Sequence, residues 1–275
     1  MLTRSGAIGL CILAIMVGVA LFAPLLAPRP PEAQDLARRL VAPGWLPGGD
    51  PQYLLGGDHL GRDILSRIIY GSRISLLVGF TAVILSSALG LVLGLTSGYF
   101  GGTLDRILMR LADVQLAFPY ILLIISVIAV VGPGLWTIIV VLGITGWVRY
   151  ARVIRGEVLS LREREFIQAT HAAGSGAFRI LSRHLLPNVM APLLVIATLE
   201  LGRIILLEAS LSFLGLGVPL EVPSWGGMLS DGRTYVATAW WLATFPGLAM
   251  FACVLGINLL GDGLRDTLDP RLRTD

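Results

Sequence analysis

Three charged side chains, Glu200, Arg203 and Glu208, interrupt a long apolar stretch between residues 185 and 217. Glu200 and Arg203 are three residues apart, a spacing at which two side chains on one helix face can form an ion pair. A charge within an apolar helix is costly to bury, so it usually pairs with another charge or faces a polar cavity. These three residues and Asp113, at the edge of another apolar stretch, are therefore the candidates for polar chemistry inside an apolar helix bundle.

The other reactive side chains do not form a recognisable site. His59, His171 and His184 are too scattered to predict a metal site, and the two cysteines, Cys11 and Cys253, do not predict a disulfide framework. The sequence has no lysine and therefore no Gly-x4-Gly-Lys-Ser/Thr phosphate-binding loop. We expect no catalytic residue, no metal and no cofactor bound by this chain, and no nucleic-acid partner.

The elements that position these residues are predicted to cross a membrane. Hydrophobic residues make up 55% of the sequence and charged residues only 14%, against about a quarter in a soluble domain. Four stretches carry no charge, and one helix needs about 20 apolar residues to cross a bilayer. The third stretch is long enough for two helices, broken at "VGPGLW". With the apolar stretch around Glu200, this predicts an all-α integral membrane protein with six transmembrane helices. The uncharged stretches are 5–28, 74–104, 114–148 and 234–261.

The expected order places a retained first helix before an exterior segment. Its apolar run of about 20 residues exceeds the about 7–15 of a cleaved signal peptide. Thirteen of the 21 arginines would lie on the interior side and seven outside, which predicts that both termini are cytoplasmic. We expect residues 1–72 to hold the first helix and exterior segment, 73–262 the core with a cytoplasmic loop at 156–187, and 263–275 a cytoplasmic tail. The expected helices are 6–27, 74–98, 105–130, 135–155, 188–214 and 238–262.

The cytoplasmic loop contains a short basic segment, "FIQATHAAGSGAFRILSRHLLPN", starting at Phe166. Apolar residues recur at helical spacing on both sides of Gly174, which predicts two short amphipathic helices joined by a left-handed turn. Pro187 is expected to stop the second helix, because proline lacks the amide hydrogen. Such a shape fits the groove of another protein, although a plain connection packed within the chain is an alternative.

The same segment resembles the EAA loop of ABC importer permeases. The family pattern is Glu-Ala-Ala, three residues, Gly, nine residues, Ile, one residue, Leu-Pro. The spacing is kept here, and the identities differ at Gln168, Thr170 and His184. Further blocks between residues 53 and 273 are similar to the dipeptide, oligopeptide and nickel branch, and most similar to its second, C-type permease subunit. They are "YLLGGDHLGRDILSRIIYGSRISLLVG", "GYFGGTLDRILMRLADVQLAFP", "EASLSFLGLGVPLEVPSWGGMLSDGR" and "NLLGDGLRDTLDPRLR".

The resemblance implies a type I ABC importer permease fold with a cytoplasmic two-helix coupling loop. It implies a multi-pass subunit of a bacterial or archaeal plasma membrane that works with a second homologous permease, two ATP-binding subunits and an exterior substrate-binding protein. ATP and Mg would be bound by the ATPase partners, so this chain would not itself be an enzyme. The residues expected to contact or shape the ATPase-coupling surface are Phe166, Gln168, Ala169, Thr170, Gly174, Phe178, Leu186 and Pro187.

The resemblance leaves the substrate open. Dipeptides or oligopeptides are the first expectation, and nickel chelates, haem or glycans are the alternatives within the branch. Arg203 could pair with Glu200 or meet a charged peptide terminus. A stand-alone secondary transporter and a membrane-embedded enzyme are the other classes, but the first would not need the Gly174–Pro187 spacing and the second lacks a catalytic cluster. "DHLGRD", from Asp58 to Asp63, looks like a site but is interpreted as a folding element.

Overall fold

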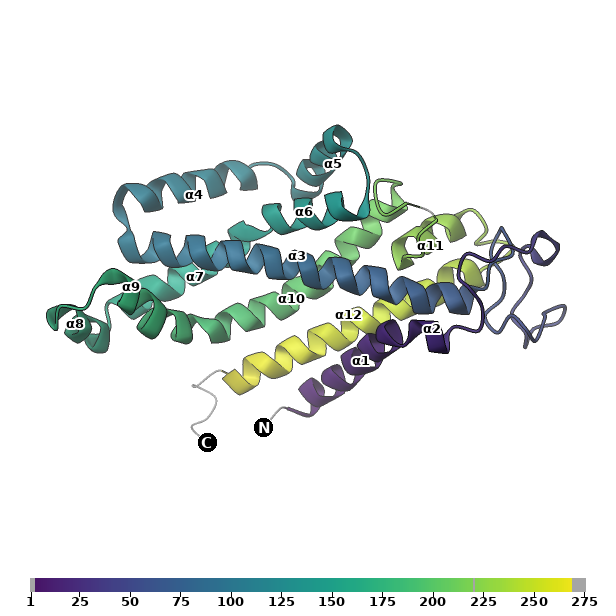
Figure 1. The fold of residues 1–275 in the computed structure, drawn as a ribbon, viewed down its shortest axis with the longest axis horizontal. Coiled ribbons are helices and arrows are strands. Elements are labelled where there is room, and N and C mark those ends of the chain that lie inside the picture. Colours follow the sequence, from purple (N-terminus) through teal and green to yellow (C-terminus); the bar gives the residue numbers. More distant parts are fainter. Residues whose placement is uncertain (1–2, 220, 269–275) are drawn as a thin grey trace.

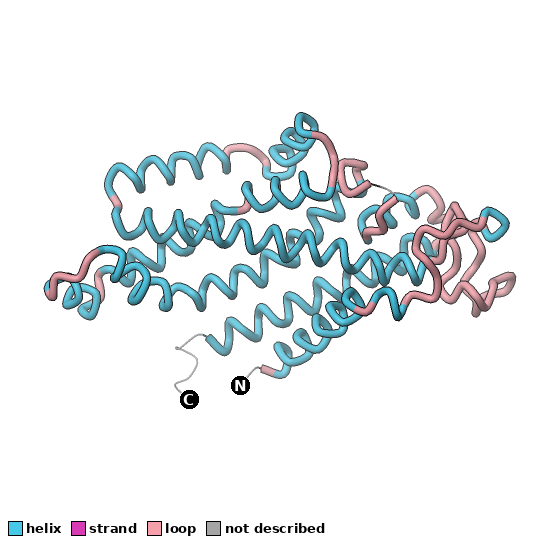
Figure 2. Tube along the Cα trace, viewed as in Figure 1, coloured by secondary structure: helices cyan, strands magenta, loops and turns pink. Residues whose placement is uncertain are grey.

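The computed structural model of the chain describes residues 3–219 and 221–268. All regular structure within these residues is helical, and the helices lie side by side in an elongated bundle (Figure 1). The longest loop, residues 27–63, lies at one end of the bundle, and the short helix α8 (Glu165–Ala172) lies at the other (Figure 2). We call these the loop end and the α8 end. The prediction of an all-α protein is confirmed.

Five helical segments are long and apolar enough to cross a membrane. A sixth is added if α4 (Gly102–Leu116) and α5 (Tyr120–Val131), which meet at an angle of 87°, are counted as one bent span. This agrees with the six helices expected. The five are α1 (Arg4–Leu21), α3 (Ile64–Phe100), α6 with α7 (Leu135–Thr145 and Trp147–Arg162), α9 with α10 (Ala177–Arg179 and Leu186–Phe213, joined by a π-helix over Ile180–Leu185), and α12 (Trp241–Leu268).

The prediction of a single helix over residues 105–130 is wrong, because the structure has two helices there. The chain breaks between α4 and α5 at Pro119, which has extended backbone angles (φ −55°, ψ 122°). Proline has no amide hydrogen to continue the helix, and it disfavours the helical conformation in the residue before it, Phe118. The break therefore places the end of α4 and the start of α5 as two separate helix termini within one span.

Three helices, α3, α7 and α12, extend past the boundaries that hydropathy suggested. α3 begins at Ile64 because Asp63 caps it, accepting hydrogen bonds from the backbone N–H and the hydroxyl of Ser66 at 2.8 and 2.6 Å. Residues 64–72, assigned to the exterior segment, are thus helical. α12 continues to Leu268, so the first six residues of the expected tail are helical, and 269–275 lie outside the described residues. Similarly, α7 extends to Arg162 inside the expected loop at 156–187. Apolar patterning marks where a helix leaves lipid, but backbone hydrogen bonding can continue in water.

α3 lies in the middle of the bundle and packs closely on α7 (Figure 1). Gly90, Gly94 and Gly98 make this approach possible, because a Cβ atom at each would lie against Tyr150, Ala151 or Val158. Small residues spaced four apart lie on one helix face and let a second helix approach closely. α1 packs on α12 in the same way, since a Cβ atom at Gly9 would collide with the α12 backbone.

The loop end is held by α11 (Trp225–Arg233) and a buried group of charges. Asp58 accepts a hydrogen bond from Nε of Arg62 at 2.6 Å, and Nε of Arg67 lies 3.7 Å from the same carboxylate oxygen. Asp231 of α11 lies 3.6 Å from Arg62. These charges join the 27–63 loop to α3 and α11, which supports a folding role for the "DHLGRD" segment.

Candidate coupling surface and intramembrane polar cluster

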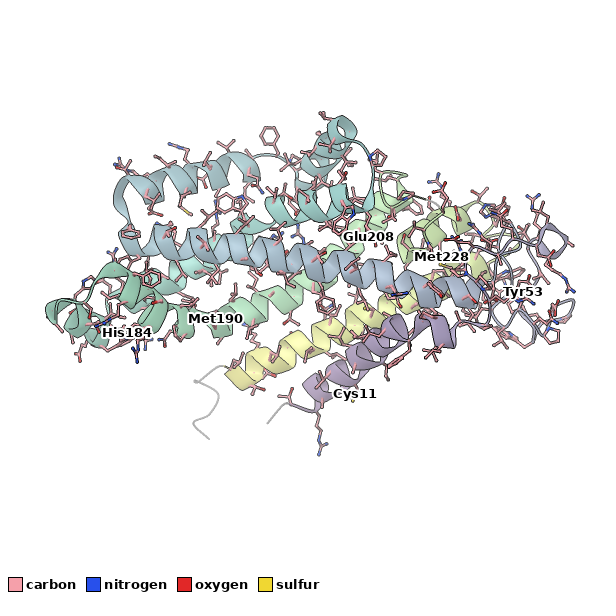
Figure 3. The ribbon with its side chains drawn as sticks, in the orientation of Figure 1. Cys11, Tyr53, His184, Met190, Glu208 and Met228 are labelled. Atoms are coloured by element: carbon pink, nitrogen blue, oxygen red, sulfur yellow. The ribbon has the colours of Figure 1, made fainter. Side chains whose placement is uncertain are left out.

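The predicted turn at Gly174 closes α8. Its φ of +76° is left-handed, a conformation that glycine adopts without strain. The N–H of Gly174 donates to the carbonyl of His171 at 2.9 Å, and the N–H of Ser175 donates to that of Thr170 at 3.2 Å. This hydrogen-bond pair is a Schellman motif. The turn sends the chain back towards the bundle at its α8 end, opposite to Tyr53 of the long loop (Figure 3 labels Tyr53 and, near α8, His184).

One side of the α8 turn is anchored and the other is free. Ile167 and Ile180 are fully buried in a cluster that includes Ile154 and Val158 of α7. Phe166 next to Ile167 is 42% exposed, and Phe178 is 84% exposed. An aromatic side chain that no residue of its own chain covers is a common anchor for a protein partner.

The remaining coupling candidates have mixed positions. Gln168 and Ala169 are exposed on α8, and Thr170 is half-buried, with its hydroxyl donating to the carbonyl of Phe166 at 2.7 Å. Leu186 is half-buried and Pro187 exposed at the start of α10. The structure therefore brings Phe166, Gln168, Ala169, Thr170, Gly174 and Phe178 to the α8 end, and places the last two at the base of the helix that returns into the bundle.

Pro187 does not stop the helix, contrary to the prediction. The chain runs from α9 through the π-helical Ile180–Leu185 into α10 with no break. Pro187 occupies the first turn of α10, where its missing N–H is tolerated, and the π-helix before it shifts the hydrogen-bond pattern from i+4 to i+5. The α8 turn therefore leads into an unbroken helical segment of 37 residues, Ala177–Phe213.

The predicted ion pair in α10 is present. Nη1 of Arg203 donates to Oε2 of Glu200 at 2.7 Å. The structure adds a partner that the sequence analysis missed: Nη1 of Arg149, on α7, donates to the other oxygen of Glu200 at 2.9 Å. Arg149 lay inside the expected helix 135–155, so its charge within an apolar segment was a usable signal. We call Arg149, Glu200 and Arg203 the intramembrane cluster.

The intramembrane cluster lies beside the break between α4 and α5. The guanidinium carbon of Arg203 lies 4.7 Å from the ring centre of Tyr120, the first residue of α5. The Tyr120 hydroxyl is 3.2 Å from that of Thr145, and the side chain of Gln115 donates to the Thr145 carbonyl at 2.5 Å. The Thr145 carbonyl at the α6–α7 junction thus accepts a hydrogen bond from a side chain next to the helix break.

The other two candidates lie elsewhere. Asp113 accepts a hydrogen bond from Arg152 at 2.5 Å, and both side chains are about half exposed. Glu208 is completely buried two turns beyond Glu200 in α10 (labelled in Figure 3), where it accepts hydrogen bonds from the hydroxyls of Ser212 at 2.8 Å and Ser75 at 3.2 Å. The four candidate charges therefore occupy three separate places. Within the described residues, no three His, Cys, Asp or Glu side chains are grouped as metal ligands would be.

Comparison with known families identifies the fold and its role. Residues 90–274 match the family described as binding-protein-dependent transport system inner membrane component. The chain belongs to this permease family. Residues 4–43 also match the N-terminal transmembrane domain of oligopeptide transport permease C. The protein is thus a multi-pass permease subunit of an ABC importer, a class of subunit that works with an ATPase and a binding protein.

Relatives of the permease are named for different substrates. It is 44% identical to the di/tripeptide transport system permease protein DppC of Pseudomonas aeruginosa, over 96% of this chain and 88% of that one. It is 43% identical to the dipeptide permease DppC of Haemophilus influenzae, over 98% and 92% of the two chains. The nickel transport system permease protein NikC of Escherichia coli K12 is 41% identical, over 98% and 95%.

A solved structure supports the permease fold. An inward-facing structure of the MetNI methionine ABC transporter aligns with a TM-score of 0.58 over 74% of this chain and 96% of the other. At 21% identity the likeness establishes the fold alone.

Proposed function

We propose that this permease is one half of the translocation pathway of an ATP-driven importer for dipeptides or oligopeptides. The names of the relatives favour peptides as the substrate, because DppC proteins of two organisms share 43–44% identity with the chain. A nickel chelate is the second candidate, supported by the 41% identity with NikC.

The anchored turn at the α8 end is the observation that supports coupling to an ATPase. Ile167 and Ile180 fix it to the bundle, while Phe166 and Phe178 remain exposed for a partner. Because α9 continues without a break into α10, a displacement of the turn would be transmitted along one continuous helical segment to the intramembrane cluster. Rigid movement of this kind is how ATP-driven closure of partner subunits can open a pathway.

The proposed assembly contains a second homologous permease, two ATP-binding subunits and an exterior binding protein in a lipid bilayer, without nucleic acid. ATP and Mg would be held by the ATP-binding subunits, and this chain would hold no cofactor. We place the α8 end in the cytoplasm of a bacterial or archaeal cell. Since α1 begins and α12 ends nearer that end (Figure 1), both termini would be cytoplasmic as well.

Uptake by the reconstituted complex tests the substrate. The permease with its partner subunits in proteoliposomes would be supplied with ATP inside, the binding protein outside, and either labelled dialanine or a nickel chelate. We expect ATP-dependent uptake of dialanine that nickel chelates do not compete for. Uptake of nickel with no uptake of dialanine would instead establish the second candidate.

Substitution at the turn tests the coupling. Gly174→Val forces a β-branched residue into a left-handed conformation, although no other atom lies within 4 Å of the new Cβ. We expect the complex to assemble and hydrolyse ATP but to take up far less dialanine per ATP. Gly176→Val is the matched control, because Gly176 is equally open but has φ −70° and ψ 156°, which valine readily adopts. If Gly174→Val transported as much per ATP as this control, the turn would not be the coupling element.

A further inference from the structure

The intramembrane cluster contains more positive than negative charge. Two guanidinium groups, of Arg149 and Arg203, share the single carboxylate of Glu200. Tyr120, beneath Arg203, contributes a ring face and a hydroxyl but no negative charge at neutral pH. The cluster therefore has one excess positive charge, which favours an anionic group from outside this chain.

The surplus charge lies at membrane depth. Arg149 belongs to the 28-residue candidate span Leu135–Arg162 and lies near the middle of that span. Gly90 of α3, within the candidate span Ile64–Phe100, packs against Trp147 and Tyr150, which flank Arg149.

The guanidinium of Arg149 is not covered by its own chain. Its side chain is 51% exposed, against 28% for Arg203 and 9% for Glu200. Among the side-chain nitrogens of Arg149, Nη1 is the one that donates a hydrogen bond to another residue within 3–219 and 221–268. A charged group with unused donors at this depth is strongly disfavoured against lipid, so the surface around it must line a polar space or meet another protein.

The geometry also fixes the guanidinium before any ligand arrives. Glu200 is 9% exposed and holds Arg149 on one oxygen and Arg203 on the other, which restrains both long side chains. A guanidinium held in this way can present its remaining donors as a fork that matches both oxygens of a carboxylate. Preorganised donors bind more tightly because less side-chain entropy is lost on binding.

We propose that Arg149, supported by Glu200 and Arg203, binds the free carboxylate of the substrate as it crosses the membrane. This inference rests on the proposed function, because a peptide with an unmodified C-terminus supplies that carboxylate. The competing possibility, a carboxylate of the second permease subunit, is an outcome of the test below. Arg149 would contact substrate directly, whereas Glu200 is a positioning residue.

The test compares an acid with its amide in the reconstituted complex. Uptake of dialanine and of dialanine amide would be measured for the wild type and for Arg149→Gln, with saturating binding protein throughout. The binding protein discriminates between acid and amide equally for the wild type and the variant. Its contribution therefore cancels when the acid-to-amide uptake ratio of one complex is divided by that of the other. We expect the acid-to-amide preference to fall by about tenfold in Arg149→Gln, the effect of losing one charge-assisted hydrogen bond. Arg149→Lys, which keeps the charge, should restore part of the preference.

Arg152→Gln is the matched control. Arg152 lies one turn further along α7 and pairs with the exposed Asp113, so its removal changes a charge on the same helix without touching the intramembrane cluster. We expect the acid-to-amide preference to stay within about twofold of the wild type, because Arg152 already has its own carboxylate in Asp113 and carries no excess charge.

The outcomes separate this inference from the proposed function. If Arg149→Gln reduces uptake of acid and amide equally, Arg149 is structural or pairs with the second permease subunit, and the carboxylate site is overturned while peptide transport stands. If the wild-type complex takes up neither compound but does take up a nickel chelate, the peptide function fails and the inference falls with it.

Discussion

Two carboxylates in this permease each hold two guanidinium groups, but in opposite surroundings. At the loop end, Asp58 contacts Arg62 at 2.6 Å and Arg67 at 3.7 Å. In the bundle, Glu200 contacts Arg203 at 2.7 Å and Arg149 at 2.9 Å. The chemistry of the two clusters is the same, so their different burial and charge balance indicate what each one does.

The loop-end cluster is closed. The side chains of Arg62 and Arg67 are 7% and 3% exposed, and a second carboxylate, Asp231, lies 3.6 Å from Arg62. Burial raises the pKa of the Asp231 carboxyl, while the nearby guanidinium groups of Arg67 and Arg62 oppose that rise. With two arginines and two carboxylates, the cluster is neutral and inaccessible, which suits a role in holding loop, α3 and α11 together.

The intramembrane cluster is open and unbalanced. It has two arginines for one carboxylate, and half of the Arg149 side chain is exposed. The donors of the loop-end cluster are enclosed by its own chain, although Nη1 of Arg67 has no hydrogen-bond partner among the described residues, whereas the exposed donors of Arg149 are accessible to a ligand or a partner. Disrupting the first should therefore affect folding most, and disrupting the second should affect transport more than stability.

The largest effect on stability is expected for Asp58→Asn. The change leaves Arg62 and Arg67 buried with less negative charge, and breaking a buried ion pair typically costs about 3–5 kcal/mol. Thermal unfolding of the purified complex measures the loss. Arg38→Gln is the control, because Arg38 is 46% exposed where it pairs with Asp50. A loss in Asp58→Asn no greater than in the control would contradict the view that burial distinguishes the two clusters.

A smaller loss is expected for Glu200→Gln. Two arginines would then face each other without a carboxylate, but both are partly exposed, so we expect about 1.5–3 kcal/mol, the range for hydrogen bonds to charged groups. The same thermal measurement applies. If Glu200→Gln destabilised the complex as much as Asp58→Asn, the intramembrane cluster would be as closed in the assembled importer as the loop-end cluster is.

Arg203→Leu should have a milder effect on stability, of about 1–2 kcal/mol, from the lost ion pair with Glu200 and the lost contact with the Tyr120 ring. Glu200 keeps Arg149 as its partner, so no lone charge is left in the membrane. Adding Glu200→Leu to this variant should make it less stable, because Arg149 would then lose its partner. Recovery of stability in the double variant would show that Arg149 and Glu200 do not pair in the complex.

The smallest effect is expected for Asp113→Asn. Asp113 and Arg152 are 55% and 46% exposed, and exposed ion pairs typically contribute about 0.2–1 kcal/mol. The change should leave thermal unfolding and dialanine uptake close to those of the wild type. Strong loss of uptake would extend the functional surface from the intramembrane cluster along α7 towards the α8 end.

Features set by neighbours in the chain could be predicted from residue order. The number of spans follows from apolar length, the Glu200–Arg203 pair from a three-residue spacing, and the left-handed turn from Gly174. The tight approach of α3 to α7 follows from glycines four residues apart. The pair and the turn depend on interactions within one or two helical turns, which spacing specifies, whereas the glycine spacing allows a close approach without saying which helix makes it.

Predictions of helix boundaries failed where the same residue type is compatible with two local structures. A proline can end a helix or occupy its first turn. Pro119 does the first and Pro187 the second, because the π-helix before Pro187 accommodates the missing hydrogen bond. Likewise, hydropathy could not find the true start of α3, since the cap at Asp63 lies outside the apolar stretch.

The partners of the charges depended on packing between distant segments. Arg149 and Glu200 are 51 residues apart, and they meet only because α7 is held against α3 and α10 in one particular register. The same packing buries Ile167 and leaves its neighbour Phe166 exposed, although both are large apolar residues. Residue types and spacing therefore define the helices and their local turns, while the alignment of helices across the bundle decides which side chains meet and which stay open, because those contacts have no signal along the chain.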